Sequence, residues 1–151
     1  MNALAAATLH RLEELHTSMK QVIVALPPVA LDWSPAAGVN SVAVLVTHVC
    51  GSERFWIGEK VGGLPAARNR SAEFVVRGMD SAALSATLDE SLAQARDVLA
   101  KLSLDDLTRP VGVSQHGFAY DVAWSLQHAL EHVALHTGHL EVTRQWWESQ
   151  Q

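Results

Sequence analysis

The segment HALEHVALHTGHL at residues 128–140 holds four of the eight histidines in the chain. In an α-helix, His132 and His136 lie one turn apart and about 40° around the axis, so their imidazoles can converge on one ion. His128 and His132 have the same spacing, whereas about 12 Å of helix rise keeps His128 from sharing an ion with His136. The spacing therefore allows a helical metal-binding pair. It equally allows core histidines that hydrogen bond to carbonyl or carboxylate groups.

A second element must supply a further ligand, because a zinc-like site with an open position uses three protein ligands. The best candidate is His48, since it stands among small or apolar residues near the start of a predicted helix. A histidine buried there needs a polar partner, and an ion shared with the 128–140 segment would supply one. Cys50 lies about 200° around the helix from His48, so we predict a core thiol rather than a fellow ligand.

Apolar residues recur at helical spacing in four stretches of the chain, which are the elements that would position these histidines. The stretches cover residues 4–26, 42–62, 81–102 and 122–147. Pro27 and Pro28 end the first helix. Side chains that can cap a helix stand at the starts of the other three, at Asn40 or Ser41, at Asp80 or Ser81, and at Asp121. The pattern predicts an all-α four-helix bundle in a single domain over residues 1–151.

Composition excludes several other classes of protein. The formal net charge is −5 and no basic run is present, so we expect no nucleic-acid partner. No apolar stretch approaches the roughly 20 residues of a membrane span, and the N-terminal residues do not resemble a signal peptide. With a single cysteine and hence no disulfide framework, a cytoplasmic location is expected. The chain has no GxSxG, P-loop or GxGxxG motif.

Three segments resemble the DinB superfamily, which includes the YfiT-like group of metal-dependent hydrolases. They are NSVAVLVTHVCGSERFWIGEKVGG, RNRSAEF and LQHALEHVALHTGHLEVTRQ. The most specific parts are NS-x-x-x-L-x-x-H and H-x-x-x-H-x-G-H-L-x-x-x-R. The resemblance implies a bundle with up-down-down-up connectivity and a three-histidine metal site made by His48, His132 and His136. Where many members have glutamine this chain has His139, which we expect to hydrogen bond near the site or pack structurally rather than bind the ion.

Three neutral imidazoles suit zinc or nickel, and they also bind iron or manganese less tightly. Such an ion could activate a water for hydrolysis or hold a thiolate ready for attack. Some relatives use low-molecular-weight thiols such as mycothiol or bacillithiol, so the resemblance favours a metal-dependent, thiol S-transferase-like enzyme acting on a small molecule. A metal-dependent hydrolase is the next hypothesis. A non-catalytic stress-response protein that binds a metal or small ligand is the third.

Two further expectations concern partners. The basic loop at Arg68, Asn69 and Arg70 could receive an anionic thiol or substrate, or could be an ordinary solvated loop. Family members often dimerise through their helices, so the resemblance also implies a homodimer.

Overall fold

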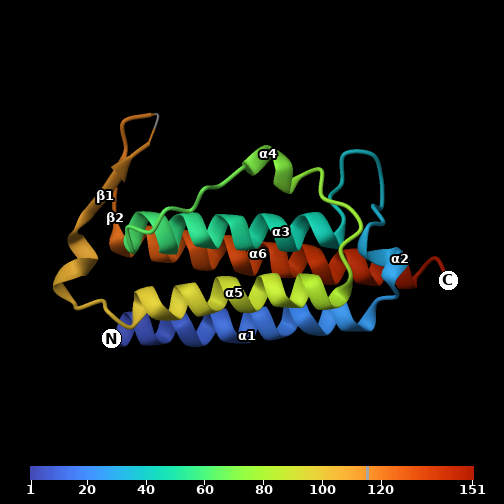
Figure 1. Ribbon diagram of the computed structural model, residues 1–151, viewed down its shortest axis with the longest axis horizontal. Helices are drawn as coiled ribbons and strands as arrows, with labels where there is room; N and C mark the ends of the chain where they lie inside the picture. The colour runs from blue at the N-terminus through green and yellow to red at the C-terminus, as the bar shows by residue number, and fades with distance from the viewer. Residues whose placement is uncertain (115) are drawn as a thin grey trace.

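A computed structural model describes residues 1–114 and 116–151, and its main body is a bundle of four long helices (Figure 1). These are α1 (Ala3–Ala25), α3 (Val42–Glu53), α5 (Ser81–Leu99) and α6 (Val122–Glu148). Figure 1 shows α3 and α6 on one side of the bundle and α1 and α5 on the other. The two helices of each pair pack together, and across the pairs α1 packs on α6 and α3 packs on α5. Helices α1 and α6 run in one direction and α3 and α5 in the opposite one, which confirms the predicted up-down-down-up bundle.

Side-chain caps fix the starts of the three later long helices, as the sequence predicts. Ser41 accepts a hydrogen bond from the Val44 amide, Asp80 from that of Ala83, and Asp121 from that of Trp124. Such caps satisfy amide groups that have no partner within the helix. At the other end of the first helix, α1 stops at Ala25, before the two prolines.

The predicted second helix ends where expected, but its hydrogen bonding changes from α-helical to π-helical along its length. Helix α3 continues into η1 (Arg54–Val61), which has π-helical hydrogen bonding. Here the backbone packs tightly on α5, because a Cβ atom at Gly58 would lie 2.6 Å from Gln94 Oε1 and one at Gly62 would lie 2.6 Å from Val98 Cγ2. Glycine thus lets η1 and the residue that follows it approach α5 closely.

The core is largely apolar, and a cluster of buried polar side chains lies within it between α1, α3 and α5. His16 Nε2 lies 2.8 Å from Glu53 Oε2, and His16 Nδ1 lies 3.2 Å from the carbonyl of Leu88. Ser91 donates a hydrogen bond of 2.7 Å to Glu53 Oε1. Glu53 and His16 therefore both have a structural role in the core.

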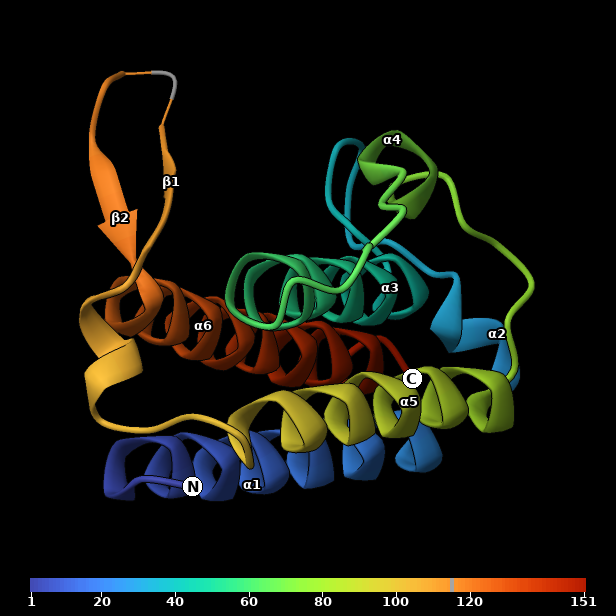
Figure 2. The same cartoon turned by 60° about the vertical axis from the view of Figure 1, so that its left-hand side comes forward.

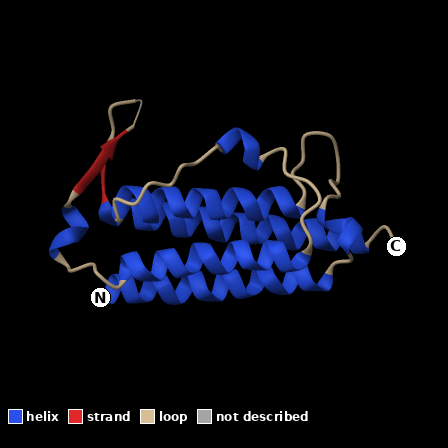
Figure 3. Ribbon diagram, viewed as in Figure 1, coloured by secondary structure: helices blue, strands red, loops and turns tan. Residues whose placement is uncertain are grey.

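The connectors follow from the directions of the helices. Because α3 and α5 are parallel, residues 62–80 must return along the bundle, and they carry the short α4 (Arg70–Glu73) over α3 (Figure 2). Residues 26–41 include α2 (Pro28–Leu31). Between α5 and α6 the chain forms a 3-10 turn, η2 (Asp105–Thr108), and a small antiparallel pair, β1 (Pro110–Val113) and β2 (Ala119–Asp121), the only strands of the described residues (Figure 3). Among residues 1–114 and 116–151, no helix is both long and apolar enough to cross a membrane.

Candidate metal centre

The three histidines singled out by the sequence lie together between α3 and α6. His48, His132 and His136 each offer one ligand atom, and these atoms all lie within 4.8 Å of one another. The Nε2 atoms of His48 and His132 are 3.2 Å apart. Two nitrogens bound to one tetrahedral zinc at about 2.0–2.1 Å would be about 3.3 Å apart. The pair is thus already spaced for a shared ion.

A buried carboxylate orients His48. Its Nδ1 lies 2.8 Å from Glu73 Oε2, and both side chains are buried. A carboxylate only accepts hydrogen bonds, so Nδ1 donates to Glu73. That leaves Nε2, which lies 3.2 Å from His132 Nε2, as the nitrogen available to an ion. Metal-binding histidines are held in this way by a carboxylate on the second ring nitrogen.

Arg68 holds that carboxylate in place from the same connector. Its Nε lies 2.6 Å from Glu73 Oε1 and its Nη2 lies 2.9 Å from Oε2, which makes a two-pronged ion pair. Burial raises the pKa of Glu73, but hydrogen bonds from Arg68 and His48 outweigh it and hold that pKa below its ordinary value. Glu73 is therefore ionised at neutral pH, and Arg68 is engaged in this ion pair. Of the other loop residues, Asn69 caps α4 and Arg70 lies 5.0 Å over the Phe74 ring.

The two histidines on α6 are neutral at physiological pH in the metal-free protein. Burial, helped by the neighbouring histidines, lowers the pKa of His132 to about 3 and that of His136 to about 4. Neutral imidazoles present lone pairs. The three side chains therefore make a set of donors that fits a divalent cation.

The remaining histidines of α6 do not join the converging group. His139 Nδ1 lies 3.2 Å from His136 Nδ1, so it contacts a candidate ligand from outside, in line with the role expected for it. The His128 ring stacks on Trp124 at 4.9 Å and meets the edge of Trp56 at 4.7 Å. Cys50 is buried, and burial raises the pKa of its thiol well above the ordinary value, as befits a core residue.

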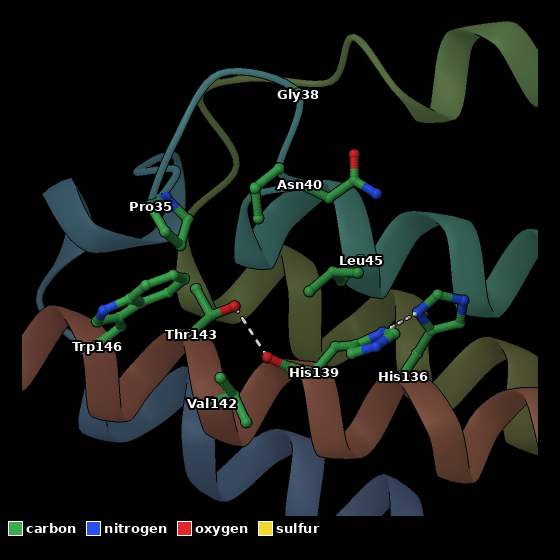
Figure 4. Close-up of a pocket in the computed structure, with 10 residues that line it drawn as sticks. Pro35, Gly38, Asn40, Leu45, His136, His139, Val142, Thr143 and Trp146 are labelled. Atoms are coloured by element: carbon green, nitrogen blue, oxygen red, sulfur yellow. Dashed lines mark hydrogen bonds between the residues drawn. The ribbon is translucent and has the colours of Figure 1, made fainter.

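A groove adjoins the three histidines and shares His136 with them (Figure 4). Its volume is about 290 Å³, close to the lower end of small-molecule sites, which span roughly 300–1,000 Å³. Its walls come from the 32–41 loop, the start of α3 and the second half of α6. The lining residues are Pro35, Gly38, Val39, Asn40, Leu45, His136, His139, Val142, Thr143 and Trp146.

Comparison with protein families settles the relationship of the chain. A sequence model of the DinB superfamily matches residues 9–140, which is most of the chain. The protein belongs to the DinB superfamily. This confirms the resemblance seen in the sequence motifs. Among curated proteins, none matches this DinB chain significantly.

Solved structures agree with the DinB fold. A conserved protein from Enterococcus faecalis matches with a TM-score of 0.78 and 18% identity over 97% of each chain. A DinB-like protein from Bacillus subtilis matches with a TM-score of 0.70 and 19% identity, over 92% of this chain and 90% of that one. A mycothiol-dependent maleylpyruvate isomerase matches with a TM-score of 0.68 and 15% identity, over 90% of this chain but 60% of the isomerase. At these identities the matches show a common fold.

Within this DinB bundle, the sequence did not predict Glu73, its pairing with Arg68, or the groove. Glu73 and Arg68 stand in the RNRSAEF segment, yet neither carries a spacing that would pair it with His48, 20 to 25 residues earlier. The groove depends on how the 32–41 loop folds back on α6, which no local pattern encodes. The signal available for Glu73 was its place in a motif segment of the family.

Proposed function

We propose that this DinB protein is a metal-dependent enzyme in which His48, His132 and His136 bind one divalent ion. The observation that carries the proposal is the convergence of three imidazoles, one of them oriented by a buried carboxylate. Zinc or nickel is the preferred ion for such a donor set, with iron or manganese as weaker alternatives. When bound, such an ion acts as a Lewis acid that lowers the pKa of a coordinated thiol or water.

We further propose that the reaction is the transfer of a low-molecular-weight thiol to a small electrophile. The sulfur forms a bond to an electrophilic carbon, the leaving group departs with its electron pair, and the thiol proton is released to solvent. Two observations support an external thiol. The single cysteine of the chain is buried with a raised pKa, so it is a poor nucleophile. A structural neighbour is named for its dependence on mycothiol.

A metal-dependent hydrolase is the second candidate function. The groove beside His136 opens to solvent, so water can reach the same site. A purely structural ion would favour a closed site with four protein ligands. The group of converging ligand atoms contains three residues and not His139, which favours an enzyme over a non-catalytic metal-binding or stress-response protein.

The first test is metal content, measured by elemental mass spectrometry on protein purified without a histidine tag. We expect about one ion per chain in the wild type and none in His132→Ala, a 1:1 site being the minimal stoichiometry for one histidine triad. A metal-free wild type that also refuses added zinc and nickel would contradict the proposal. The loaded protein is then assayed for loss of free thiol with an alkylating electrophile and, separately, for ester hydrolysis. Faster hydrolysis with no thiol consumption would favour the hydrolase.

The homodimer and the cytoplasmic location implied earlier stay predictions. Light scattering coupled to gel filtration measures the first directly.

A further inference from the structure

The groove beside His136 has an unusual lining for a site next to a cation. None of its ten lining residues is Asp, Glu, Lys or Arg. Five are apolar: Pro35, Val39, Leu45, Val142 and Trp146. Moving a charged group out of water without a partner costs a large amount of free energy. The groove therefore disfavours a phosphate, carboxylate or ammonium group along most of its length.

The groove leads away from the candidate ion. His136 belongs to both the histidine group and the groove lining. Trp146 follows His136 by ten residues on the same helix, a rise of about 15 Å. Figure 4 shows Pro35 and Trp146 facing one another at one end and His136 at the other, with Leu45 and Val142 between the two ends. A molecule in the groove can thus be apolar at one end while its other end reaches the histidines.

The loop that forms one wall is held at several points. Trp33 packs edge-on against Trp147 of α6 with ring centroids 5.4 Å apart. Asp32 accepts a 2.8 Å hydrogen bond from the Gly78 amide. Gly38 turns the chain at a φ of +80°, which residues with side chains rarely adopt. These contacts hold the groove in shape before any ligand binds. A preformed site loses less conformational entropy when a ligand binds.

We infer that the groove binds the uncharged apolar part of the substrate, an aromatic ring or a short aliphatic chain, while the reacting end lies at the three histidines. This inference rests on the metal site of the proposed function and adds the class of substrate. The groove would select compounds by apolar contact with Val142 and Trp146, as small-molecule sites commonly do.

The test uses protein loaded with Co²⁺ and two thiol probes, benzyl mercaptan and 2-mercaptoethanol. The first carries a ring that can enter the groove, and the second carries a small polar group. Thiolate-to-cobalt charge-transfer absorption reports binding of either probe at the ion. We expect the wild type to bind benzyl mercaptan at least about tenfold more tightly, the ratio that corresponds to burying a modest apolar area.

Val142→Asp places a charge in the groove, and Leu135→Asp is the matched control. Both residues are exposed positions of α6, at 55% and 57%, but only Val142 lines the groove. We expect Val142→Asp to weaken the binding of benzyl mercaptan about tenfold and that of 2-mercaptoethanol less than about twofold. Trp146→Ala should also weaken the binding of benzyl mercaptan more than that of 2-mercaptoethanol. Leu135→Asp should leave the affinity for both thiols unchanged.

The possible failures are distinguishable. Equal affinity of the wild type for both thiols, or an equal loss of both in Val142→Asp, overturns the inference and leaves the metal site standing. A protein that binds no Co²⁺, or whose cobalt takes neither thiol, overturns the proposed function and the inference with it.

Discussion

The carboxylate of Glu73 reaches His48 across the α-carbon of Gly51. His48 and Gly51 lie one turn apart on α3, and a Cβ atom built at Gly51 would collide with Glu73 Oε1 and lie 2.8 Å from Glu73 Cδ. The hydrogen bond between His48 Nδ1 and Glu73 Oε2 therefore requires glycine at this position of the helix.

Gly51→Ala should weaken metal binding without damaging the bundle. The added methyl group pushes Glu73 off His48, and loss of such a supporting carboxylate typically costs about 10- to 100-fold in metal affinity. Zinc affinity is measured by competition with a chromogenic chelator. The control is Gly138→Ala on α6, where a Cβ meets nothing within 4 Å. Equal affinities in the two variants would show that the approach of Glu73 does not matter.

Glu73→Gln should lower metal affinity over the same range of about 10- to 100-fold, because the neutral amide orients and polarises His48 less well. The side chain keeps its size, so the fold should be retained, although Arg68 loses its ionic partner. Isothermal titration with zinc gives the affinity. Glu131→Gln removes the same charge from an exposed position of α6 and should leave zinc binding unchanged. A wild-type affinity in Glu73→Gln would contradict the orienting role.

Acid should destabilise the metal-free protein through the α6 histidines. Their pKa values in the folded state, about 3 for His132 and about 4 for His136, lie below the ordinary value of 6.5. The unfolded chain thus binds more protons between these limits, and stability falls as pH drops from about 6.5 toward 4. Urea midpoints at pH 7 and pH 5 measure the loss, which should be smaller in His132→Ala than in the wild type. An equal loss in both proteins would mean that other groups govern acid sensitivity.

Breaking the buried contact between His16 and Glu53 should affect stability but not the metal. Both side chains are 1% exposed, so His16→Ala leaves the buried Glu53 carboxyl group without its His16 hydrogen-bond partner. Leaving a buried polar group without its partner costs about 1–3 kcal/mol. Urea unfolding measures this change in the free energy of unfolding. Zinc affinity, measured below the unfolding transition, should stay at the wild-type value, and a large fall would show that the core pair and the metal centre are coupled.

The parts of the fold and site that the sequence predicted are those fixed by local spacing. The capping side chains of Ser41, Asp80 and Asp121 act within one helical turn. The His132 and His136 pair follows from the 3.6-residue period of a helix. His48 could be chosen because a histidine among apolar neighbours needs a partner. In each case the signal lies within a few residues of the feature.

The parts that the sequence did not predict depend on long-range packing. The π-helical η1 arises where glycines let the backbone approach α5. Glu73 contacts His48 because the connector of residues 62–80 places α4 against α3. The groove forms where Trp33 anchors the 32–41 loop on α6. None of these contacts has a periodicity that a local pattern could reveal.

Residues 62–80, which return along the bundle, support the candidate metal site, whereas the long helices form most of the core. The connector brings Arg68 and Glu73 to His48 from outside. Substitutions at these two residues can therefore change how strongly the proposed ion is held while the bundle stays folded, whereas Val76 and Met79 of the same connector pack against the core. The parallel course of α3 and α5 makes a long connector unavoidable, and one part of it can vary without loss of core packing.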